Sequence, residues 1–195
     1  MKDNRISDYV RNYFNRLHEY LSTINPEVFD QIIEQMETTR KANSTIYIIG
    51  NGGSASIASH IANDMGVGIR HEGIKPLKIL SLTDNVSAIS ALGNDKGYDS
   101  IFSEQLRPIL HPLDLLIALS VSGNSPNIIK AVEFAKKMGV TIIGCTGFDG
   151  GELKKLCDIS FHIENEKSNY GPVEDAFMVL NHLIYTYYRF ERYRS

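Results

Sequence analysis

The sequence predicts an α/β protein in which helices cover both faces of a parallel sheet. After residue 43, short apolar runs rich in β-branched residues alternate with segments of helical periodicity. This alternation is typical of strand–helix–strand crossovers, which place successive strands parallel to one another. The runs expected to be strands cover residues 45–49, 77–82, 115–119, 140–145 and 159–163.

The first 43 residues are predicted to form two helices. Apolar residues between Val10 and Leu21 recur at three- and four-residue steps, and Pro26 begins a second helix over 26–41. Further helices are expected over 54–65, 86–92, 98–110, 126–138 and 173–190, with a short helical turn near Leu153. We therefore expect a single domain over 1–195, with a helical extension (1–43) that packs in an oligomer and an α/β core (44–195) that ends in a long helix.

Composition excludes several classes of protein. The 195 residues contain 20 Lys plus Arg and 23 Asp plus Glu, a net charge of −3, so the basic excess of a nucleic-acid-binding protein is missing. The two cysteines show neither a disulfide framework nor a paired metal spacing, which favours a reducing compartment. No apolar run is long enough to span a bilayer, and the N-terminus has no apolar signal core. A cytoplasmic location, with no membrane partner, is predicted.

Two loops are candidate ligand sites because each follows a predicted strand and opens a helix. The first, GNGGSA at residues 50–55, has glycines that allow close backbone approach and helix amides that attract an anion. A plain strand-to-helix turn capped by Ser54 fits this loop equally well. A dinucleotide-binding loop fits poorly, because the acidic partner it needs could only be Asp84, which lies too far along the chain.

The second loop, SVSGNSPN at residues 120–127, favours a ligand site over a plain turn. It places the hydroxyls of Ser120, Ser122 and Ser125 within six residues, and Pro126 suits the first turn of a helix. One serine is enough to cap a helix, so three indicate a different task. Hydroxyls and helix-terminal amides without a nearby cation suit a phosphate monoester.

These segments resemble the sugar isomerase (SIS) domain family and, within it, the phosphoheptose isomerases. The resemblance is carried by residues 50–54, 93–95, 120–125 and 146–151, together with His60 and His182. It implies a three-layer α/β/α sandwich around a five-stranded parallel sheet, of the flavodoxin-like kind, and a homotetramer. It also implies aldose–ketose isomerisation of sedoheptulose 7-phosphate to glycero-manno-heptose 7-phosphate through an enediol, in the supply of heptose for surface polysaccharide.

Four polar residues on two predicted helices are candidates for the chemistry. His60 and Asp64 are four residues apart on one helix face, a spacing that fits two metal ligands, an acid–base pair or a surface ion pair. Glu174 and His182 are eight residues apart, about 12 Å along an unbroken helix, which is too far for both to reach one ion. Either the last helix begins after Glu174, or the site combines residues of different subunits. The resemblance favours the second alternative.

The resemblance also implies a role for each site residue. Asp64 and His182 would carry the proton transfers. A divalent ion, with zinc expected and no nucleotide cofactor, would be held by His60, Asp64, Glu174 and His182. Substrate contacts, including those to phosphate, would come from Asn51, Gly52, Gly53, Ser54, Asn94, Asp95, Ser120, Val121 (through its backbone), Ser122, Ser125 and Glu174.

Three positions depart from the family pattern. The catalytic Glu of the family is Asp64 here, which could move the base by ~1 Å and cost about 10²-fold in rate unless something compensates. Glu174 stands where the family has Gln, and Gly68 stands where it often has a basic residue. An alternative hypothesis is a phosphosugar-binding regulator, or an adaptor for a replication initiator, on the same fold. The retained His60, Asp64, Glu174 and His182 argue against it, because an adaptor needs no such set.

Overall fold

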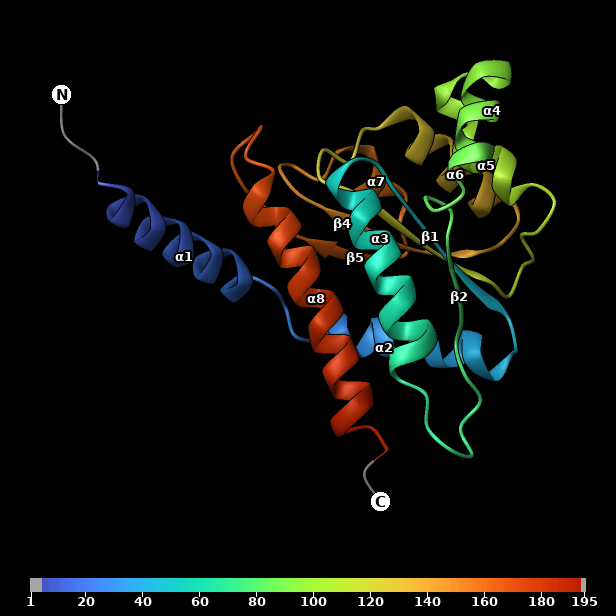
Figure 1. The fold of residues 1–195 in the computed structure, drawn as a ribbon, viewed down its shortest axis with the longest axis horizontal. Coiled ribbons are helices and arrows are strands. Elements are labelled where there is room, and N and C mark those ends of the chain that lie inside the picture. Colours follow the sequence, from blue (N-terminus) through green and yellow to red (C-terminus); the bar gives the residue numbers. More distant parts are fainter. Residues whose placement is uncertain (1–4, 194–195) are drawn as a thin grey trace.

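The computed structural model describes residues 5–193 and contains a five-stranded sheet with all neighbouring strands parallel (Figure 1). The strand order is β2-β1-β3-β4-β5, which is the flavodoxin-like order. The strands are β1 (Thr45–Gly50), β2 (Lys78–Ser81), β3 (Leu115–Ser120), β4 (Thr141–Thr146) and β5 (Ile159–His162). Every residue of β3 is buried, as expected for a central strand covered on both faces. The predicted fold class is confirmed.

Helices form a layer on each face of the sheet. One face is covered by α2 (Glu27–Lys41), α3 (Gly53–Asn63) and α8 (Gly171–Phe190), and the other by α5 (Ile101–Leu106), α6 (Pro126–Lys137) and α7 (Gly151–Leu156). The helix α4 (Val86–Lys96) has no buried residue, and a short 3₁₀ turn (Tyr98–Ser100) joins it to α5. These are the three layers that the resemblance implied.

The N-terminal helix α1 (Ile6–Ser22) extends away from the rest of the chain (Figure 1). It has no buried residue, and the large apolar side chains of Ile6, Tyr9 and Phe14 are exposed. Two features connect it to the rest of the chain: the Tyr13 hydroxyl donates a hydrogen bond to Asp175 on α8, and Leu17, Tyr20 and Leu21 pack against the core. Residues 1–4 of the predicted extension lie outside the described residues.

Two helix boundaries differ from the sequence prediction in ways that matter for the site. The last helix begins at Gly171, with Pro172 in its first turn, so Glu174 lies inside the helix. The alternative in which α8 starts after Glu174 is therefore wrong. The helix α3 ends at Asn63 instead of running on to Met65, and the chain widens into a π-helical turn over Asp64–Gly68. Such turns are frequently found at functional sites.

A buried carboxylate fixes the C-terminal half of α8 against α2. Glu37 is 3% exposed and accepts a hydrogen bond from the Tyr188 hydroxyl at 2.9 Å. It also forms ion pairs with Arg40 at 2.5 Å and Arg192 at 3.4 Å. Burial alone would raise the pKa of this carboxyl, but the hydrogen bonds from Arg40 and Tyr188 and the two positive charges lower the pKa to about 2.

Candidate active site

The first part of the candidate site is a pocket at the point where the sheet changes its winding direction. The strands β1 and β3 are neighbours, but α3 and α6, which follow them, pack on opposite faces. Ligands of open parallel sheets bind at such a switch point, beyond the carboxyl ends of the strands. A pocket of about 130 Å³ lies there, lined by Asn51, Ser54, Leu119, Ser120, Val121, Ser122, Ser125, Tyr170 and Glu174. Both predicted loops therefore contribute to one pocket.

The serine loop after β3 is held rigidly by its neighbours. The Ser120 hydroxyl lies 3.3 Å from that of Ser125, the residue that precedes α6. Val121 accepts a backbone hydrogen bond from Gly147 at 2.8 Å, and Gly123 accepts one from Leu153 at 2.9 Å. Gly123 has φ +64° and lies so close to the Gly150 carbonyl that a Cβ would overlap it. The three hydroxyls therefore lie on a loop whose backbone is fixed by hydrogen bonds to the neighbouring segments.

The glycine loop after β1 differs from the prediction at Ser54. The residue before α3 is Gly52 with φ +53°, and no side chain caps the helix, so Ser54 is not the N-cap. Its side chain lines the pocket instead, and the residue is buried. Gly52 takes the position before the helix because its left-handed φ is one that glycine adopts without strain.

Asn51 joins the two loops. Its side-chain amide and that of Asn127 on α6 exchange two hydrogen bonds, of 2.9 and 2.8 Å, and its oxygen also accepts one from the Tyr98 hydroxyl at 3.1 Å. The side-chain oxygen of Asn51 therefore already accepts two hydrogen bonds, from Asn127 and from Tyr98. Asn51 therefore fixes the pocket wall as well as lining it.

Glu174 enters the same pocket from α8. Its carboxyl lies against Gly53, where a Cβ would overlap the carboxyl oxygens unless the Glu174 side chain moved. Burial and, to a smaller extent, the charge of Asp175 raise the pKa of Glu174. A carboxyl group thus shares the pocket with the three serines that suit a phosphate.

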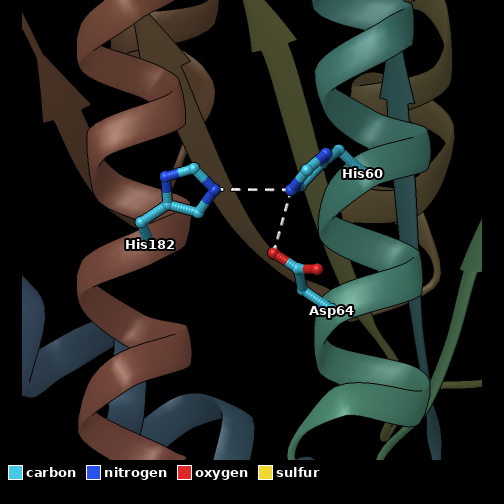
Figure 2. Close-up of side chains that lie close together, drawn as sticks. All are labelled: His60, Asp64 and His182. Atoms are coloured by element: carbon cyan, nitrogen blue, oxygen red, sulfur yellow. Dashed lines mark hydrogen bonds and ion pairs between the residues drawn. The ribbon is translucent and has the colours of Figure 1, made fainter.

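The second part of the site is a cluster of His60, Asp64 and His182 (Figure 2). His60 Nε2 lies 3.0 Å from Asp64 Oδ2 and 3.4 Å from His182 Nε2. His60 is on α3, Asp64 begins the π-helical turn, and His182 projects from α8. Glu174 lies beside Gly53 and His182 beside His60, so α3 and α8 run in the same direction. This shared direction places the cluster about 12 Å along α8 from Glu174.

The cluster fits a divalent metal ion by the chemistry of its donors. Its three ligand atoms lie within 4.8 Å of one another, and two imidazoles with one carboxylate form a donor set typical of catalytic zinc sites. Three of the four ligands that the resemblance implied are therefore close together. Glu174, the fourth, lies in the phosphate-type pocket instead.

Asn94 and Asp95 are part of neither the pocket lining nor the His60 cluster. They are exposed near the C-terminal end of α4, where the Asn94 amide donates to the Asp95 carboxylate at 2.8 Å. Neither is among the described residues that line the pocket. Their predicted contact with the sugar stays a prediction.

Sequence reasoning missed three residues that shape the site. Tyr170 lines the pocket, Asn127 holds Asn51, and Asn181 on α8 donates to Asp64. Asn127 lies within the serine-rich segment and could have been singled out as a buried amide at a helix start. Tyr170 and Asn181 carry no local sequence signal, because their roles depend on how α8 packs.

Comparison with known proteins identifies the class. The SIS domain model matches residues 8–147, and the chain belongs to this family. Within the family the chain is of the phosphoheptose isomerase type. It is 35% identical over 182 residues to the phosphoheptose isomerase of Akkermansia muciniphila, covering 92% of this chain and 94% of the relative. It is 38% identical over 173 residues to that of Trichlorobacter lovleyi, covering 88% and 84%.

Solved structures agree with this assignment. The structure of a phosphoheptose isomerase from Neisseria gonorrhoeae is similar with a TM-score of 0.84 and 29% identity, over 96% of this chain and 98% of that one. One from Francisella tularensis gives a TM-score of 0.83 and 25% identity, over 95% and 98%. Within residues 5–193, no helix is both long and apolar enough to cross a membrane.

Proposed function

We propose that this protein isomerises sedoheptulose 7-phosphate to glycero-manno-heptose 7-phosphate, as part of heptose supply for surface polysaccharide. The observation that carries the proposal is the placement of a phosphate-type pocket and a His–Asp–His cluster along the same pair of helices. In an open-chain sugar phosphate, the phosphate and the carbonyl carbons lie at opposite ends. An isomerase therefore needs an anchoring site and a proton-transfer site that are well separated, as these two are.

The anchoring site holds the substrate through neutral groups. Ser120, Ser122 and Ser125 supply hydroxyls, and the N-terminal ends of α3 and α6 supply backbone amides and the positive ends of their dipoles. This chemistry explains how a chain with a net charge of −3 can bind an anion. The Glu174 carboxyl at the same pocket is placed to accept hydrogen bonds from sugar hydroxyls.

The proton-transfer site moves a proton between C1 and C2. We assign the base and the acid to Asp64 and His182, which approach each other from the π-helical turn after α3 and from α8. His60, at 3.0 Å from Asp64, holds that carboxylate in place. Zinc is the divalent ion that we propose for His60, Asp64 and His182. When bound, it supplies a Lewis acid that polarises the substrate carbonyl.

A direct assay tests this function. Purified protein incubated with sedoheptulose 7-phosphate should form the aldose product, detected by NMR. The activity should be lost when a chelator is added and restored by added zinc. A folded, oligomeric protein that forms no product in either condition would contradict the heptose assignment. Such a protein, recovered with a specific protein partner, would instead favour the regulator or adaptor hypothesis.

We further propose that the complete site forms between copies of the chain in a homotetramer. Glu174 lies about 12 Å along α8 from His182 within one chain, and α1 leaves an apolar face exposed. Mixing the inactive variants Asp95→Ala and His60→Ala should restore part of the activity if one site takes these residues from two chains. Mixtures without activity, under conditions where subunits exchange, would show that each site belongs to one chain.

We also propose a cytoplasmic location, in line with the free thiols of Cys145 and Cys157.

A further inference from the structure

Asn181 on α8 is a polar side chain in an otherwise apolar part of the core. It is 1% exposed, and its Oδ1 atom has no hydrogen-bond partner among residues 5–193. It borders a small cavity of about 20 Å³ whose other lining residues are apolar: Ile32, Met36, Ile61, Met65, Ile117, Ile143, Cys145, Leu180 and Ile184. A buried oxygen without a partner destabilises a fold. Stability therefore gives no reason for an amide at this position.

The nitrogen end of the same amide, in contrast, has a partner. Asn181 Nδ2 donates to Asp64 Oδ2 at 2.8 Å, and this oxygen also lies 3.0 Å from His60 Nε2. A carboxylate only accepts hydrogen bonds, so the amide must present its nitrogen to Asp64 and its oxygen to the apolar cavity. The orphaned oxygen is thus a direct consequence of the contact with Asp64.

The hydrogen bond between Asn181 and Asp64 also bears on the short side chain of Asp64. Asp64 stands where the resemblance implies a Glu, so its carboxylate is one methylene group nearer to the backbone. We propose that Asn181 is a positioning residue, which holds the Asp64 carboxylate in line with His60 and His182 to bind a divalent cation. The inference rests on the proposed function. Groups that orient a metal ligand in this way typically change metal affinity by 10–100-fold.

The variant Asn181→Leu separates positioning from packing. Leucine is close to asparagine in size and suits the apolar cavity, so the metal-free protein should unfold at the same or a higher temperature. Zinc affinity, measured by competition with a chelator, should fall 10–100-fold. A merely structural Asn181 predicts the reverse: lower thermal stability and unchanged zinc affinity. Met36→Leu is the matched control, since Met36 lines the same cavity without a hydrogen bond to Asp64, and its zinc affinity should stay within about twofold of the wild type.

Two further variants test the fit between the side chains at positions 64 and 181. Asp64→Glu should bind zinc weakly because its longer side chain collides with the Asn181 amide. Adding Asn181→Ala makes room, so the double variant should bind zinc about tenfold more tightly than Asp64→Glu alone. Additive effects, or wild-type zinc affinity in Asn181→Leu, would overturn the inference. So would a wild-type protein that isomerises sugar phosphate without binding a divalent ion, although the proposed function would then stand. A protein that binds zinc as expected but forms no product would contradict the function instead.

Discussion

The phosphate-type pocket and the His60 cluster are built in different ways. The pocket comes from two loops that directly follow β1 and β3, and backbone hydrogen bonds within one chain fix its serine loop. The cluster comes from the side-by-side packing of α3 and α8, and the His60 side chain is 44% exposed. The difference teaches that the proposed phosphate site is formed by residues close in sequence to the strand ends, whereas the proposed proton-transfer site depends on the packing of distant helices and on a neighbouring copy.

The largest effect is expected from removing a side chain of the cluster. His182→Ala should lower kcat about 10³-fold while the fold persists, because His182 is exposed and is proposed to carry a proton. Inorganic phosphate binding, measured by calorimetry, should remain as in the wild type. Thr186→Ala, one turn further along α8, is the control and should retain full activity. A His182→Ala variant with more than a tenth of wild-type activity would contradict the assignment.

Loosening the packing of α8 should harm the cluster and spare the pocket. Glu37→Gln leaves the partly buried charges of Arg40 and Arg192 without their carboxylate partner, so the free energy of unfolding at pH 7 should fall by about 3 kcal/mol. Zinc affinity should fall as well, whereas phosphate affinity should not. Equal losses at both sites would remove the distinction between them.

The same variant has a defined pH dependence. The folded-state pKa of Glu37, about 2, lies below the ordinary value of 4.5. Its contribution to stability is therefore fully present above pH 4.5 and is lost as the pH falls towards 2. Urea unfolding should show the difference between the wild type and Glu37→Gln shrinking over this interval. A difference that does not change with pH would mean that another group stabilises the fold there.

A substitution in the serine loop should affect binding more than turnover. Ser122→Ala removes one hydroxyl from the pocket, and a hydrogen bond to a charged group contributes about 1.5–3 kcal/mol. KM should therefore rise about 10–100-fold, with a smaller change in kcat. Ser87→Ala, on the exposed surface of α4, is the control. A change confined to kcat would place Ser122 in the chemistry instead of the anchoring.

The smallest effect is expected at Glu174. Glu174→Gln removes a negative charge from the pocket, so inorganic phosphate should bind about fivefold more tightly at pH 8, as expected for a repulsion of roughly 1 kcal/mol. Because burial and Asp175 raise the pKa of Glu174, its carboxyl takes up a proton at a higher pH than an ordinary Glu. The advantage of the variant should disappear as the pH falls through that raised pKa. Weaker phosphate binding by the variant at pH 8 would show that the carboxyl assists the ligand.

Sequence patterns predicted the parts of the molecule that short-range rules determine. The buried strands, the serine loop and the pairing of His60 with Asp64 follow from local periodicity and spacing. The alternative in which Ser54 caps α3 was wrong because glycine competes well for the position before a helix when φ is positive. The meeting of His182 with His60, and of Asn181 with Asp64, depends on the register of two helices more than 100 residues apart in the chain. No local pattern determines that register.

A crystal structure of the protein with bound sedoheptulose 7-phosphate tests the central claim most directly. We expect the phosphate among Ser120, Ser122 and Ser125, and C1 or C2 within about 3.5 Å of Asp64 and His182, from the same or a neighbouring copy. A phosphate bound outside this pocket, or carbonyl carbons distant from every Asp64 and His182 in the assembly, would contradict the account.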